Sequence, residues 1–217
     1  MAVRSSVGVF QIGLNRALKK LFFPHYRFRA AKGGLKFDDG IKNPKRRGKT
    51  VDRNVTQLVN LCKTKALPEA SEHFSGIFRT QLIEYLIANR LKPVTSQHPV
   101  CDESVRVGTK IDLICKTADG KYAIIENKIG YTHSLYVHSR TSMRSPYQHL
   151  NDSLHNQMQL YLHHAVALFT KQHPSRTIDS SACVILRMAP DALEVIRMRP
   201  DISVNLSLLG GANKRRH

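Results

Sequence analysis

The chain has 217 residues and a mass of 24.6 kDa, which is room for one hydrophobic core and too little for two substantial ones. Its composition, 41% apolar and 23% charged, is that of a folded globular protein and excludes collagen-like, coiled-coil and wholly disordered chains. No apolar stretch reaches the roughly 18 residues that a membrane span needs, so we expect no membrane partner.

The charge is strongly unbalanced, with 34 Lys and Arg against 16 Asp and Glu and a formal net charge of +18. Such a surplus predicts a polyanionic partner, most often nucleic acid, because each neutralised phosphate releases counterions. A ribosome-like scaffold or a basic organellar protein is the alternative. The four cysteines form no C-x-x-C pair and no metal-ligand spacing with histidine, so we expect reduced thiols in an intracellular protein and no structural zinc.

The N-terminal segment, residues 1–37, contains eight Lys or Arg and no acidic residue. This composition is typical of a mitochondrial transit peptide. The alternative is a basic arm that lies on nucleic acid or directs the protein to the nucleus or a viral replication site. We expect a turn-rich linker over 38–49, one folded domain over 50–209 and a loose basic tail over 210–217.

Hydrophobic periodicity predicts an α/β domain with a central mixed sheet flanked by helices. The Asp119-Gly120 pair predicts the turn of a hairpin that joins two of the strands. In chain order, the pattern predicts helices over 49–63 and 74–91, strands over 95–101, 105–116 and 122–129, a helix over 152–170, and strands over 182–188 and 194–198.

The two strands of this hairpin carry charged residues inside apolar runs. Side chains alternate faces along a strand, so Glu126 and Lys128 share one face, while Asp112 lies in an apolar run of the neighbouring strand. Burying such charges without a partner or a metal would cost several kcal/mol. Two converging carboxylates suit Mg²⁺ or Mn²⁺, which can bind a phosphate oxygen and activate water. A structural Glu–Lys or Asp–Lys pair is the alternative.

The order Asp112, hairpin, Glu126-Asn127-Lys128 resembles the motif of the PD-(D/E)XK nuclease superfamily. Gln157 and Tyr161, one helical turn apart, resemble the Q-x-x-x-Y motif of its RecB-like and lambda-exonuclease-like branch; both could instead belong to the helix core and its rim. The resemblance covers residues 48–170. Ile111 stands where the superfamily usually has Pro, and Gly108 stands one residue further from the acid than is frequent.

The resemblance implies a restriction-endonuclease-like fold and a Mg²⁺- or Mn²⁺-dependent nuclease. In this role, Asp112, Glu126 and the backbone carbonyl of Asn127 bind the metal, Lys128 assists the attacking water, and the Q-x-x-x-Y pair positions the strand. It favours DNA over RNA as substrate, and an exonuclease of genome maintenance, recombination or repair over an endonuclease. A nuclease fold without turnover, acting in nucleic-acid binding or ribonucleoprotein assembly, remains the alternative.

The branch also has a His or an acid on a helix before the sheet, and two residues compete for this place. Asp52 opens the first predicted helix and Glu84 lies on the second; we favour Asp52. The segment 131–150 interleaves aromatic and cationic residues, which suits a single-stranded substrate, with Arg140 and Arg144 contacting phosphates. A surface loop is the alternative for this segment.

Overall fold

The computed structural model describes residues 12–23, 44–129 and 141–213, which form an α/β unit with a mixed, open sheet of six strands. The strands are β1 (Ile12–Gly13), β2 (Lys92–Asp102), β3 (Val107–Lys116), β4 (Tyr122–Ile129), β5 (Val184–Met188) and β6 (Leu193–Arg197). The helices are α1 (Leu14–Leu21), α2 (Pro44–Leu61), α3 (Leu67–Ser71), α4 (Glu84–Ala88) and α5 (Leu154–Gln172), with a π-helix η1 (Phe78–Ile83) and the 3₁₀ segments η2 (Ser180–Ala182) and η3 (Leu206–Asn213).

The predicted hairpin is confirmed as β3 and β4, which pair antiparallel. Gly120 adopts a φ of +82°, a left-handed conformation that glycine tolerates without strain, and its amide donates to the carbonyl of Thr117. The α/β class is also confirmed, since β1 pairs parallel with β3 and β4 pairs parallel with β5. No helix among the described residues is long and apolar enough to cross a membrane.

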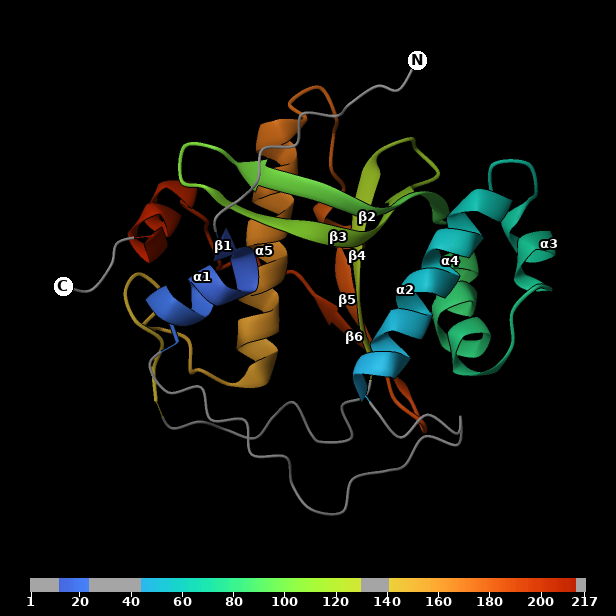
Figure 1. Cartoon of the computed structure of the whole chain (residues 1–217), viewed down its shortest axis with the longest axis horizontal. Coiled ribbons are helices and arrows are strands. Elements are labelled where there is room, and N and C mark those ends of the chain that lie inside the picture. The colour runs from blue at the N-terminus through green and yellow to red at the C-terminus, as the bar shows by residue number, and fades with distance from the viewer. Residues whose placement is uncertain (1–11, 24–43, 130–140, 214–217) are drawn as a thin grey trace.

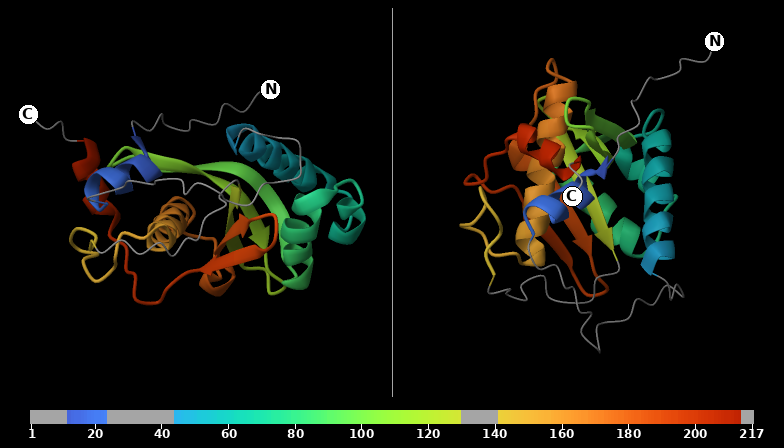
Figure 2. Two further views of the ribbon diagram at one scale, coloured as in Figure 1. Left: turned by 90° about the horizontal axis from the view of Figure 1, so that it is seen from below. Right: turned by 60° about the vertical axis from the view of Figure 1, so that its left-hand side comes forward.

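The sheet buries both of its faces (Figures 1 and 2). One face, with Ile124 and Ile185, packs against α5 and α1. The other face, with Leu113, Ile125 and Leu186, packs against α2, α3, η1 and α4. This two-sided burial explains why the central strands read as nearly continuous apolar runs in which a charged residue stands out.

The ordered domain begins and ends beyond the predicted bounds of 50 and 209. Residues 12–23 do not form a separate arm: Leu14 and Leu18 have no exposed surface and belong to the core on the α5 side. Helix α2 begins at Pro44, inside the predicted linker. In the predicted tail, Ala212 is buried, and Lys20 Nζ donates to its carbonyl at 2.6 Å. The basic composition of these segments concealed the apolar positions that anchor them.

The edge of β3 that faces β4 is paired in two separate stretches. Strand β2 occupies the other edge from Val107 to Lys116, with no strand pair at Asp112. On the edge facing β4, β1 pairs only with residues 107–108, and β4 pairs only with residues 113–116. Residues 109–112 therefore have no strand partner on this edge within the described part of the chain, and side chains can complete the hydrogen bonding there.

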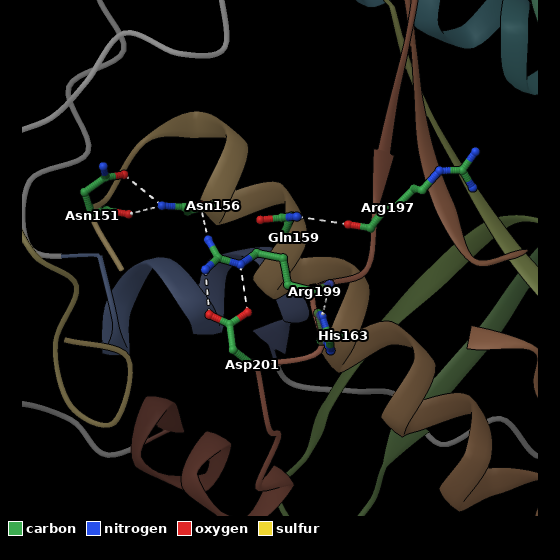
Figure 3. Close-up of polar contacts among 7 residues, drawn as sticks. All are labelled: Asn151, Asn156, Gln159, His163, Arg197, Arg199 and Asp201. Carbon is green, nitrogen blue, oxygen red and sulfur yellow. Dashed lines mark hydrogen bonds and ion pairs between the residues drawn. The ribbon is translucent and has the colours of Figure 1, made fainter. Parts of the chain in front are cut away.

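A polar seam joins α5 to the segment that follows β6 (Figure 3). Gln159 Nε2 donates to the carbonyl of Arg197 at 2.9 Å, and the amide of Arg199 donates to His163 Nε2 at 3.1 Å. The Arg199 guanidinium forms an ion pair with Asp201. These contacts tie α5 to the end of β6 and to the segment that follows it.

A buried histidine lies next to this seam on α5. His164 has no exposed surface, and its Nδ1–H donates to the carbonyl of Leu160 at 2.8 Å. Its ring lies near those of Phe22 and Tyr147. Burial lowers the pKa of His164 to about 4, because the charged imidazolium cannot be solvated in this position.

We expect this histidine to make the fold sensitive to acid. The unfolded chain takes up the proton near pH 6.5 and the folded protein only near pH 4. The free energy of unfolding therefore falls as the pH drops through this window, by up to roughly 3 kcal/mol from this residue. Urea unfolding at pH 7.0 and 4.5 measures the loss. His164→Leu should reduce it and the exposed His149→Leu should not; equal losses in both variants would contradict the assignment.

Candidate active site

Asp112 and Glu126 meet at the point where β4 leaves β3. The amide of Asn127 donates to Asp112 Oδ2 at 2.9 Å, and the amide of Asp112 lies 3.4 Å from Glu126 Oε1. Both contacts follow directly after the last main-chain pair, Leu113 with Ile125. The two carboxylates thus complete the hydrogen bonding of the diverging strands and lie close to each other.

The environment of Glu126 opposes its ionisation. Its side chain is 1% exposed, and its pKa is raised to about 8, first by burial and then by the charge of Asp112. The Lys128 ammonium acts in the opposite direction but does not cancel these effects. A divalent cation bound by both carboxylates would remove the repulsion and stabilise the ionised form.

The main chain of Asn127 faces the same site. Its amide bonds to Asp112 Oδ2, and the N–H and C=O of one residue point to the same edge of a strand, so its carbonyl also faces β3. Its side chain alternates to the other face, where neither Oδ1 nor Nδ2 has a hydrogen-bond partner within the described residues.

Lys128 lies on the Glu126 face of β4 and points toward α5. Its Nζ is 3.5 Å from Glu126 Oε2 and 5.5 Å from the centre of the Tyr161 ring. Tyr161 OH and Thr109 Oγ1 are 2.8 Å apart. Burial, followed by the charge of Glu126, raises the pKa of Tyr161, which keeps the phenol protonated. Tyr161 therefore supports the lysine and also reaches the unpaired stretch of β3.

The structure distinguishes the two candidate helix acids. Asp52, on α2, is half-buried, and its pKa is raised first by burial and then by the charge of Asp112, with Lys128 opposing. These electrostatic interactions place its carboxylate in the neighbourhood of both groups. Glu84 is exposed at the start of α4. Of the two acids, Asp52 is therefore the one whose pKa responds to the charges of Asp112 and Lys128.

The other predicted substrate contacts make hydrogen bonds to the main chain or lie outside the described residues. Gln157 is buried and its Nε2 donates to the carbonyl of Asp152 at 2.8 Å. Arg144 Nη1 donates to the carbonyl of Lys20 at 3.1 Å, so it holds the end of α1. Arg140 lies outside the described residues.

A cavity of about 630 Å³ opens beside Lys128, between α1, the unpaired stretch of β3 and the first turns of α5. Gln157 and Tyr161 line it, and so do Arg16 and Lys19 of α1. The sequence pattern did not single out these two basic residues as site residues, because their segment resembles a transit peptide.

Gln97 of β2 was also missed. It lies between the β2–β3 pairs Ser96–Leu113 and His98–Ile111, opposite Asp112, and its Nε2 donates to Asp112 Oδ1 at 3.3 Å. Its φ of 49° is a left-handed conformation that is unfavourable for a non-glycine residue. The surrounding pairs hold it there, and a weakly patterned strand offers no sequence signal for such a residue.

The residues present fit a hard divalent cation. The described residues contain no group of three or more His, Cys, Asp or Glu side chains placed to hold a metal. Mg²⁺ usually takes one or two carboxylates and completes its shell with water and substrate phosphate. Asp112, Glu126 and the Asn127 carbonyl supply such oxygen donors, and they lie together where β4 leaves β3.

We expect Glu126→Gln to stabilise the metal-free protein. A carboxyl whose pKa is about 8 in the fold and near 4.5 when unfolded weakens the fold progressively as the pH rises through this window. The variant should therefore gain roughly 1–3 kcal/mol at pH 7.5 and little at pH 5 in urea unfolding. The exposed Glu84→Gln is the control; a loss of stability in Glu126→Gln at pH 7.5 would contradict the prediction.

No protein-family model matches this chain, and no curated protein sequence matches it. Its function therefore has to be inferred from the chemistry of the residues around Asp112 and Glu126.

Proposed function

We propose that this chain is a metal-dependent nuclease with a restriction-endonuclease-like fold that hydrolyses phosphodiester bonds in DNA. The observation that carries the proposal is the meeting of Asp112 and Glu126 at the divergence of β3 and β4, with Lys128 on the Glu126 face. The mixed sheet with helices on both faces supports it. So does the resemblance of these residues to the PD-(D/E)XK motif.

In this proposal, Asp112, Glu126 and the carbonyl of Asn127 hold Mg²⁺ or Mn²⁺. The bound ion supplies Lewis-acid stabilisation of the phosphate and lowers the pKa of water. Lys128 Nζ, held between Glu126 and the Tyr161 ring, donates a hydrogen bond to the attacking water or to a phosphate oxygen. Asp52 adds negative charge on the α2 side and can orient water.

The formal net charge of +18 and the resemblance favour DNA bound through its phosphates. The resemblance further favours an exonuclease that acts in genome maintenance, recombination or repair, and the basic N-terminal composition favours the mitochondrion. Leu14 and Leu18 pack in the core. Removal of residues 1–37 as a transit peptide would therefore also remove part of the core.

A nucleic-acid-binding protein without turnover is the second candidate. The close contact of Lys128 with Glu126 favours it, because such a pair can serve a purely structural role in a sheet. The charge and the basic cavity would serve binding equally well in this case.

Incubating the purified chain with end-labelled single-stranded and double-stranded DNA in Mg²⁺, Mn²⁺ or EDTA tests the proposal. We expect labelled products with either metal and none in EDTA. Release of mononucleotides from one end would identify an exonuclease, and internal fragments an endonuclease. Binding without products in either metal would favour the second candidate.

A further inference from the structure

The cavity between α1 and α5 has an unusual charge. Four cationic residues line it: Arg16 and Lys19 from α1, Lys110 from β3 and Lys128 from β4. Among the described residues, no Asp or Glu lines this cavity. Lys128 is also 3.5 Å from Glu126 Oε2, but the cations around this hollow still repel each other, so an anion in the hollow would be favoured.

The fold holds α1 rigidly at this cavity. Leu14 and Leu18 are fully buried, and β1, directly before the helix, pairs with Val107 and Gly108 of β3. On the other side, a side chain at Gly211 would come within 3.3 Å of Leu21, which shows how closely η3 packs against the helix. The position of the α1 cations relative to β3 is therefore determined by the core.

The polar groups of the cavity suit a phosphate oxygen. Lys19 is partly buried, and burial lowers its pKa, so an anion beside its ammonium would offset the lost solvation. The Thr109 and Tyr161 hydroxyls and the Gln157 amide lie on the β3 and α5 sides. Guanidinium, ammonium, hydroxyl and amide groups together match the donors that bind nucleic-acid phosphates.

We propose that this cavity is a phosphate-binding subsite for a nucleic-acid strand, in which Arg16 and Lys19 hold a phosphate next to the one that is cleaved. The inference deepens the proposed function, because Lys128 belongs both to the cavity and to the group around Asp112 and Glu126. It gives the N-terminal helix a role in substrate binding as well as in the core. The bound phosphate can be an internal phosphate or a terminal phosphate of the nucleic-acid strand.

The test measures binding in EDTA, so that it does not depend on catalysis. Fluorescent single-stranded DNA carrying a 5′-phosphate, a 3′-phosphate or no terminal phosphate is titrated against the wild type and Arg16→Gln/Lys19→Gln. The matched control is Lys63→Gln/Arg79→Gln, which removes the same two charges from exposed positions on the other side of the sheet. Arg16→Gln alone serves as a second variant, because Arg16 is exposed and does not support the core.

We expect the Arg16→Gln/Lys19→Gln variant to bind roughly tenfold or more weakly than the control variant. The slope of the logarithm of its affinity against the logarithm of the salt concentration should also become shallower, by the amount that corresponds to about two lost phosphate contacts. Equal weakening for all three oligonucleotides assigns the subsite to internal phosphates, and weakening confined to one phosphorylated end assigns it to a terminal phosphate. Equal affinities and salt slopes for the two double variants would overturn the proposal. Binding by the wild type without cleavage in metal would instead remove the nuclease assignment and leave the subsite standing.

Discussion

Asp112→Asn is expected to reduce metal-dependent DNA cleavage by at least roughly a thousandfold, because it removes one of the two carboxylates that hold the ion. An Asn side chain can still accept the hydrogen bond from the Asn127 amide, so the strand divergence should persist. The measurement is the rate of product release from end-labelled DNA at saturating Mg²⁺.

Lys128→Met should cause a loss of roughly 10²–10³-fold in the same assay, because the ammonium would no longer neutralise charge on the phosphate. The control is Asp119→Asn, which changes an exposed carboxylate in the hairpin turn.

DNA binding in EDTA should stay within about threefold for Asp112→Asn, since only the charge at the ion site changes. Undiminished cleavage by Asp112→Asn would show that the activity arises elsewhere on the chain.

Leu18→Ala is expected to lower the free energy of unfolding by roughly 2–5 kcal/mol, because Leu18 of α1 is fully buried against the core on the α5 side. The exposed Asn15→Ala on the same helix is the control and should change stability by about 0.5 kcal/mol or less. Urea unfolding followed by circular dichroism measures both.

Truncation of the N-terminal segment is also expected to lower the stability of the fold. Deleting residues 1–23 removes α1 and exposes the apolar surface that it covers, so the shortened chain should unfold at a lower urea concentration than the full chain. An unchanged midpoint would show that the remaining domain does not depend on α1. Such a result would be compatible with a transit peptide that includes the helix.

Several parts of the site could be predicted because they depend on local order in the chain. The Asp119-Gly120 turn makes β3 and β4 neighbours, and alternation along β4 puts Glu126 and Lys128 on one face. An acid within an apolar run is conspicuous, so Asp112 could also be identified. The choice of Asp52 over Glu84 depended on the resemblance, and the structure brings Asp52 into the field of Asp112 and Lys128.

The contributions of α1 and β2 could not be predicted in this way. Arg16 and Lys19 lie more than 90 residues before Asp112 in the chain, and nothing in the local pattern indicates that β1 pairs with the far end of β3. The position of Gln97 depends on the register of β2 against β3, which the pairing of whole strands determines. The net charge gives only the excess of basic over acidic residues. Which basic residues line one cavity is decided by the fold.

The amino-acid sequence alone predicted the main helices and strands between α2 and β6, the hairpin and the two acids on adjacent strands, because hydrophobic periodicity and turn residues act over short distances. Packing decided which segments belong to the core, where β3 is left unpaired, and which cations surround the cavity. These features depend on contacts between residues far apart in the chain, and such contacts form only when both faces of the sheet are covered.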